Sequence, residues 1–135
     1  MIDYKENTEI KRTDLEQLYL SVGWFAYTLD MDILENAVNN SLSVITAWQD
    51  DKLVGLIRAV GDGVTILYVQ DILINPEFQN KGIGTILMTK IIDKYNNVRQ
   101  KVLLTEEAPD VRHFYEKFNF VSCDQGNAVA FYREF

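Results

Sequence analysis

The chain has 135 residues, 47% of them hydrophobic and 24% charged, which excludes a disordered polypeptide and fits one folded domain over residues 1–135. Its single cysteine excludes an internal disulfide and disfavours a cysteine-rich metal site, so we expect no metal. Residues 1–78 hold 13 acidic against 5 basic residues, a balance that disfavours nucleic acid and suits a cationic molecule, or simply keeps the surface soluble.

The first forty residues predict one strand and two helices. A short strand is expected over 2–6. The run Thr13-Asp14-Leu15-Glu16 matches a capping box, in which a hydroxyl and a carboxylate bond the free amides of a helix start. The helix it opens is predicted to end near Val22, and a second helix is expected over 32–40.

The middle of the chain predicts three strands joined by tight turns. Polar residues 49–52 separate the expected strands 43–48 and 53–60, as in a hairpin. A longer strand is expected over 64–74, ending at Asn75-Pro76.

Beyond residue 80 the pattern becomes helical and then returns to strands. From Gly82 the apolar residues recur at three and four, which predicts an amphipathic helix. A short buried strand is expected over 102–105, followed by a helix that Pro109 opens and Asn119 ends in a left-handed conformation. Strands are expected over 120–123 and 128–133, and Cys123 is expected to be a packing residue. The order of elements predicts an α/β or α+β domain around a mixed sheet.

The link between the long strand and the Gly82 helix carries the chemistry. A helix start exposes amides without partners and the positive end of the helix dipole. Gly82 and Gly84 keep Cβ atoms away from those amides, and Lys81 adds a cation, so the segment suits a pyrophosphate. The segment lacks the Lys-Ser/Thr pair of a Walker loop and the third glycine of a dinucleotide fingerprint. Two glycines alone also suit a turn without a ligand.

Two segments resemble signatures of one family, the GNAT superfamily of N-acetyltransferases. Gln79-Asn80-Lys81-Gly82-Ile83-Gly84 is similar to its Gln/Arg-x-x-Gly-x-Gly/Ala motif, and Phe114-Tyr115-Glu116-Lys117-Phe118-Asn119-Phe120 to its Phe-Tyr-x-x-x-Gly-Phe block. The resemblance spans roughly residues 43–133. Residues 18–24, 57–62 and 70–74 look similar to the plant and cyanobacterial serotonin-N-acetyltransferase-like branch, although branch membership fixes a substrate poorly.

The resemblance implies a single-domain fold with a central mixed, mostly antiparallel sheet, flanked by helices and splayed at the site of acetyl-CoA. It implies direct attack of a primary amine on the thioester in a ternary complex, with an oxyanion held by an N–H near Leu73. Tyr115 is the candidate acid for the leaving thiolate, although helical spacing also suits it to the core. The implied cofactor-binding residues are Ile72, Leu73, Ile74, Gln79, Asn80, Lys81, Gly82, Ile83, Gly84 and Thr85.

Asp71 is the candidate group for the amine's proton. It is expected to act as a base, directly or through water, or to hold the ammonium group. Strict alternation places it on the other face from its neighbours unless a bulge intervenes, and a bulge is common here in the family. Trp24, Phe25 and Tyr27 follow the first helix, where the superfamily usually binds its acceptor.

Other readings stay open at this point. Asn119 replaces the family's glycine, and Glu106-Glu107-Ala108-Pro109 stands where an Asn is common, which puts one cofactor contact in doubt. Acetylation of a protein lysine or N-terminus, a non-catalytic acyl-CoA-binding domain and a homodimer all fit the sequence. A cytoplasmic protein without membrane association is expected, because no run reaches ~18 apolar residues and residues 1–6 do not resemble a signal peptide.

Overall fold

The computed structural model describes residues 1–134 and divides the chain into two compact units, Met1–Leu103 and Leu104–Phe135. The first unit contains, in chain order, β1 (Asp3–Glu6), α1 (Arg12–Ser21), α2 (Phe25–Thr28), α3 (Met31–Asn39), β2 (Ser43–Gln49), β3 (Lys52–Val60), β4 (Ile66–Ile74), the 3-10 helix η1 (Pro76–Phe78), α4 (Ile83–Lys94) and β5 (Gln100–Leu103).

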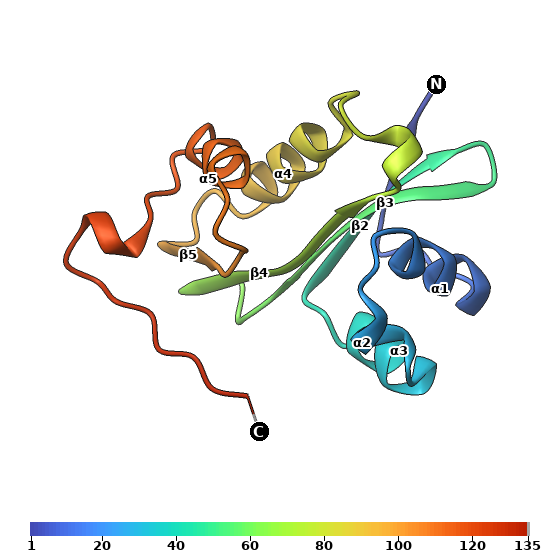
Figure 1. Ribbon diagram of the computed structural model, residues 1–135, viewed down its shortest axis with the longest axis horizontal. Coiled ribbons are helices and arrows are strands. Elements are labelled where there is room, and N and C mark those ends of the chain that lie inside the picture. Colours follow the sequence, from blue (N-terminus) through green and yellow to red (C-terminus); the bar gives the residue numbers. More distant parts are fainter. Residues whose placement is uncertain (135) are drawn as a thin grey trace. The chain divides into compact units, whose positions relative to one another are not determined.

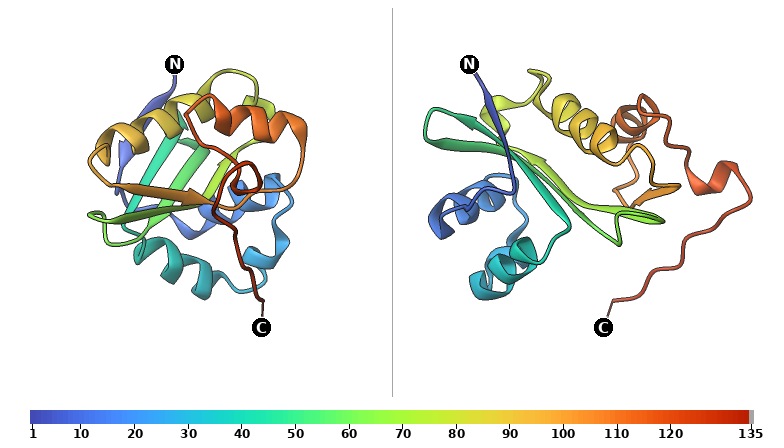
Figure 2. Two further views of the ribbon diagram at one scale, coloured as in Figure 1. Left: turned by 90° about the vertical axis from the view of Figure 1, so that its left-hand side faces the viewer. Right: turned by 180° about the vertical axis from the view of Figure 1, so that it is seen from behind.

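The sheet of the first unit confirms the expected architecture. Its strands lie in the order β1-β2-β3-β4-β5, and every neighbouring pair is antiparallel except β4 and β5. The parallel pair requires a crossover, which α4 provides. Helix α4 covers one face of the sheet, and α1, α2 and α3 lie on the other (Figures 1 and 2).

Each face of the sheet has its own apolar core. On the face of α1 and α3 the buried cluster comprises Leu15, Leu18, Tyr19, Leu34, Val38, Val44, Trp48, Leu53, Leu56 and Leu73. Helix α4 buries Ile83, Leu87, Met88 and Ile91 against the opposite face. A Cβ on Gly55 would meet Ile74 Cδ1 at 3.0 Å and Ile83 Cγ2 at 3.3 Å. The first residue of α4 therefore packs where the sheet has no side chain.

The N-terminal helices differ from expectation in three respects. Helix α1 begins at Arg12, one residue before Thr13, and no side chain caps it, so the predicted capping box is wrong. A box needs its hydroxyl residue outside the helix, and here Thr13 already lies in the first turn. The short helix α2 was not predicted. Helix α3 starts at Met31, one residue before the expected start, because the Asp30 carboxylate accepts hydrogen bonds from two of its first amides.

The second unit contains the helix α5 (Pro109–Glu116) and the 3-10 helix η2 (Cys123–Gln125). Asn119 takes the expected left-handed conformation, with φ 66°. The strands expected over 120–123 and 128–133 are wrong: residues 104–134 contain no strand. Alternating apolar residues specify the faces of a strand, but a strand also needs a partner for its backbone hydrogen bonds. Cys123 is exposed, so its expected packing role is also wrong.

Candidate functional site

The link from β4 to α4 is held by its own polar groups. The Asn75 carbonyl accepts from the Phe78 N–H at 2.8 Å, and Asn75 Oδ1 accepts from the Glu77 N–H at 2.9 Å. Gln79 Nε2 donates to the carbonyl of Ile74 at 3.1 Å. Gln79, expected to bind cofactor, therefore ties the loop to the end of β4.

The start of α4 presents free amides to open space. Gly82 stands at the N-cap with φ 83°, a left-handed conformation that favours glycine, and Asn80 is also left-handed with φ 63°. A Cβ on Gly82 would meet no atom within 4 Å. No side chain caps the helix, and its first backbone bond runs from the Ile86 N–H to the Gly82 carbonyl. The N–H groups of residues 83–85 thus have no partner within the helix and point outward, as an anion site requires.

Two lysines flank this loop. The Lys81 ammonium lies 5.3 Å from the centre of the Phe78 ring, and the Lys52 ammonium lies 5.5 Å from the same ring. Lys52 comes from the β2–β3 hairpin and also faces Glu77 at 3.8 Å. Both cations add to the positive potential of the helix start.

The edge of β4 opens on the side of β5. Strand β5 pairs with β4 only from Ile66 to Val69, so the expected splay is present. The Asn75 N–H donates to Val54 of β3, and ladder alternation therefore points the Leu73 N–H toward β3 as well. The backbone groups of Ile72 and Ile74 face the open edge instead. Of the N–H groups of Ile72 and Leu73, the one that faces this edge is therefore that of Ile72.

A β-bulge in β4 determines where Asp71 points. Asp71 pairs with Arg58, but Val69 pairs with the next residue, Ala59, which leaves Gln70 as the extra residue. Arg58 and Ala59 face opposite sides of the sheet because they are consecutive in a strand. The expected bulge is therefore present, and it turns Asp71 to the face of α1 and α2.

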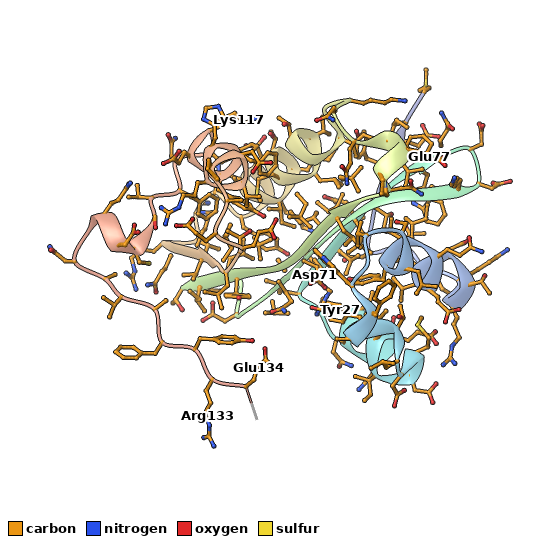
Figure 3. The ribbon with its side chains drawn as sticks, viewed as in Figure 1. Tyr27, Asp71, Glu77, Lys117, Arg133 and Glu134 are labelled. Carbon is orange, nitrogen blue, oxygen red and sulfur yellow. The ribbon has the colours of Figure 1, made fainter. Side chains whose placement is uncertain are left out.

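The Asp71 carboxylate lies inside a hydrogen-bond network. Its Oδ2 accepts from the Tyr19 hydroxyl at 2.8 Å and from Nε and Nη2 of Arg58, both at 2.9 Å. Its Oδ1 accepts from the Tyr27 hydroxyl at 2.7 Å. Figure 3 shows Tyr27 and Asp71 side by side, from α2 and β4. Asp71 is only 3% exposed. Its expected role as a base or an ammonium anchor stays a prediction.

The network shifts the pKa values of its members. Burial raises the pKa of Tyr27, and its hydrogen bond to Asp71 raises it further. The pKa of Tyr19 is raised by the same two causes, together with the charge of Asp71. Burial lowers the pKa of Arg58, but the charge of Asp71, the neighbouring tyrosines and the hydrogen bond to Asp71 together outweigh burial and raise that pKa. Both phenols stay protonated, and Arg58 balances the charge of Asp71.

The structure brings together two of the three expected acceptor-lining aromatics. The Tyr27 ring packs against Tyr19 at 5.0 Å and lies 6.2 Å from Trp24. Trp24 is 37% exposed and also meets the edge of Tyr19. Phe25 is 60% exposed.

Tyr115, the expected acid, lies in the second unit on α5. Its ring packs edge-on against Phe114 at 5.1 Å and Phe120 at 6.3 Å. Burial raises the pKa of Tyr115, and a hydrogen bond with Thr105 partly opposes that rise. The hydroxyl therefore keeps its proton at neutral pH.

Sequence reasoning missed Arg58 and Gly55. Arg58 is the only charged residue within the apolar run of β3, just as Asp71 is within β4. Opposite charges inside two neighbouring apolar strands signal a buried pair, because a lone buried charge is strongly unfavourable. Gly55 carries no such signal, because its need for space depends on a helix far along the chain.

Two kinds of feature are absent from residues 1–134. No group of three or more His, Cys, Asp or Glu side chains is arranged to hold a metal ion within that range. Within the same residues, no helix combines the length and apolar character needed to cross a membrane.

Known proteins show the same features. The model of the acetyltransferase (GNAT) family matches residues 8–120. An "uncharacterized N-acetyltransferase ycf52" of Pyropia yezoensis is 32% identical over 124 residues, covering 89% of this chain and 70% of that protein. A GNAT-family acetyltransferase structure from Streptococcus pneumoniae superposes with a TM-score of 0.89 at 32% identity, covering 100% and 98% of the two chains. AAC(6′)-Iy, solved with a CoA bisubstrate analogue, shares the fold at 17% identity and TM-score 0.67, covering 100% and 99%. The chain therefore belongs to the GNAT family of N-acetyltransferases.

Proposed function

We propose that this protein transfers the acetyl group of acetyl-CoA to a primary amine by direct attack within a ternary complex. One observation carries the proposal: the open edge of β4 leads directly into the free amides of α4. An extended thioester arm with a pyrophosphate at its far end needs an unpaired strand edge and an anion site in that order.

Two stretches of this surface would bind the donor. The Ile72 carbonyl and the Ile74 N–H bond the pantetheine arm as an added strand would, and Leu73 packs beneath them in the core. The amides of residues 81–85 take the pyrophosphate. Asn80 and Gly82 supply the left-handed turns that aim those amides outward, and Gln79 keeps the loop on β4.

The reaction forms a C–N bond, breaks a C–S bond and moves a proton from nitrogen to sulfur overall. The neutral amine nitrogen attacks the thioester carbonyl carbon, and the carbonyl oxygen becomes an oxyanion that the Ile72 N–H stabilises. The C–S bond then breaks, and the thiolate takes a proton from the candidate acid Tyr115. The attacking nitrogen releases its extra proton to solvent, and the Tyr115 phenolate takes one back from solvent, so the products are the amide and the CoA thiol. A phenol with a raised pKa is protonated at neutral pH, as a proton donor must be.

The acceptor would bind beside the aromatic residues that flank α2. Trp24 and Tyr27 form one wall, and the exposed Phe25 extends it. Aromatic faces favour both apolar groups and cations, so a primary amine on an aromatic or aliphatic scaffold fits. The CoA bisubstrate analogue bound by AAC(6′)-Iy supports a ternary complex in a protein of this fold.

The proposal is tested by measuring thiol release from acetyl-CoA with a panel of amines and lysine peptides. Turnover with small amines supports it, and turnover with peptides alone favours a protein acceptor. Binding of CoA without any turnover would identify a non-catalytic acyl-CoA-binding domain.

A charge reversal tests the donor site separately. Lys81→Glu places a carboxylate beside the proposed pyrophosphate, and CoA affinity by calorimetry should fall by roughly tenfold or more. Lys90→Glu makes the same charge change later on α4 and serves as the control. Equal affinities of the two variants contradict the loop assignment.

A further inference from the structure

Helix α2 packs against α1 and α3, but it is short. It spans four residues, none of them buried, and so short a helix is not stable alone in water. Tyr27 is the residue of α2 that bonds the sheet. Its hydroxyl donates to Asp71 Oδ1 at 2.7 Å and accepts from Gln70 Nε2 at 3.2 Å.

The bulge makes this double contact possible. Gln70 and Asp71 are consecutive, and in a regular strand their side chains would leave opposite faces of the sheet. The extra residue in β4 lets both reach the same phenol oxygen. Two hydrogen bonds therefore fix the orientation of the Tyr27 hydroxyl: it donates one to Asp71 and accepts one from Gln70.

The charge of Asp71 is already matched inside the protein. Arg58 gives it two hydrogen bonds and a third to the Ser41 hydroxyl at 3.4 Å, and its side chain is only 6% exposed. Tyr19 of α1 fills a further position on Oδ2. The charged or titratable groups that face Asp71 are thus Tyr19, Tyr27 and Arg58, one from each neighbouring element.

We propose that Asp71 is a positioning residue: neutralised by Arg58, it fixes the Tyr27 hydroxyl and thereby holds α2 and Trp24 as the wall of the amine site, without taking the amine's proton. The inference rests on the proposed function, because it assigns α2 to the acceptor. The amine must then reach its neutral form by losing its proton to solvent.

The test separates positioning from proton transfer. Tyr27→Phe keeps the ring and removes one hydrogen bond to a carboxylate, so the KM for the amine should rise roughly tenfold while the Kd for CoA stays the same. Asp71→Asn should lower kcat/KM by a constant factor and leave its dependence on pH unchanged. Tyr19→Phe loses an equivalent bond to Asp71 outside α2, and it should raise KM by less than Tyr27→Phe.

A second measurement does not depend on activity. Trp24 is 37% exposed and Trp48 is 7% exposed, so acrylamide quenching of tryptophan fluorescence reports mainly on Trp24. Tyr27→Phe should increase quenching because α2 is released from the sheet. The same readout applies if wild-type protein acetylates none of the amines, an outcome that refutes the proposed function and leaves this test intact.

Three results would overturn the positioning role. The first is that kcat/KM rises with pH in the wild type but no longer does so in Asp71→Asn. That result identifies Asp71 as the base, directly or through Tyr27. The second is an unchanged KM together with unchanged Trp24 quenching in Tyr27→Phe. The third is an equal increase of KM in Tyr19→Phe and Tyr27→Phe.

Discussion

Removing the charge of Arg58 should destabilise the protein more than any other single polar substitution in the sheet. Arg58→Met keeps the length of the side chain and its apolar packing, but it leaves the Asp71 carboxylate buried without a cation. The guanidinium makes two bonds of 2.9 Å to Asp71 Oδ2, and the two side chains are 6% and 3% exposed. Solvent therefore cannot replace the lost partner.

The expected size follows from this burial. Removing one partner of a buried ion pair typically costs about 3–5 kcal/mol, because the other charge stays desolvated. The total stability of a domain is about 5–15 kcal/mol, so Arg58→Met should retain only part of it. For a chain of this size we expect the melting temperature to fall by roughly 10–20 °C.

Urea denaturation followed by circular dichroism measures the loss, and a double-mutant cycle assigns it to the pair. Asp71→Asn alone leaves Arg58 unpaired and should also be costly. The double variant Arg58→Met/Asp71→Asn contains neither charge and should be more stable than the sum of the single losses implies, by about 1–3 kcal/mol. A loss under about 1 kcal/mol in Arg58→Met, or strict additivity in the cycle, would refute the buried pair.

Three more outcomes are expected. Gly55→Val should destabilise the fold by about 1–3 kcal/mol and weaken CoA binding in calorimetry, because the valine side chain displaces Ile83 at the start of α4. Gly126→Ala, in open space, is the control, and normal CoA affinity in Gly55→Val would contradict the coupling between Gly55 and the start of α4. Tyr115→Phe should keep CoA affinity and lower turnover by about 10²–10⁴-fold, and full turnover at all pH values would make Tyr115 a packing residue. The folded state holds the Tyr19 proton more tightly than the unfolded state, so the free energy of unfolding, measured by urea titration, should fall above pH ~10 by about 1.4 kcal/mol per pH unit. Tyr19→Phe should flatten that fall, and parallel stability–pH curves for the variant and the wild type would disprove the assignment to Tyr19.

The elements that local sequence determines were predicted well. The helix after Gly82 and the helix after Pro109 both form, because spacing of apolar residues and proline at a helix start act within a few residues. Gly82 and Asn119 take the left-handed conformations expected of them for the same reason. The motif around Gly82 also led to the correct family.

Only the tertiary structure decided which groups meet across the sheet. The apolar pattern of residues 128–133 could not supply a strand with a partner, and no strand forms there; Phe131 is left exposed. The bulge at Gln70 and the register with Arg58 place Asp71 among four donor groups, which its own stretch of sequence does not reveal. Local sequence determines a residue's conformation, whereas its partners come from segments that lie far away along the chain. The chemical role of Asp71 depends on those partners and so could not be read from the sequence alone.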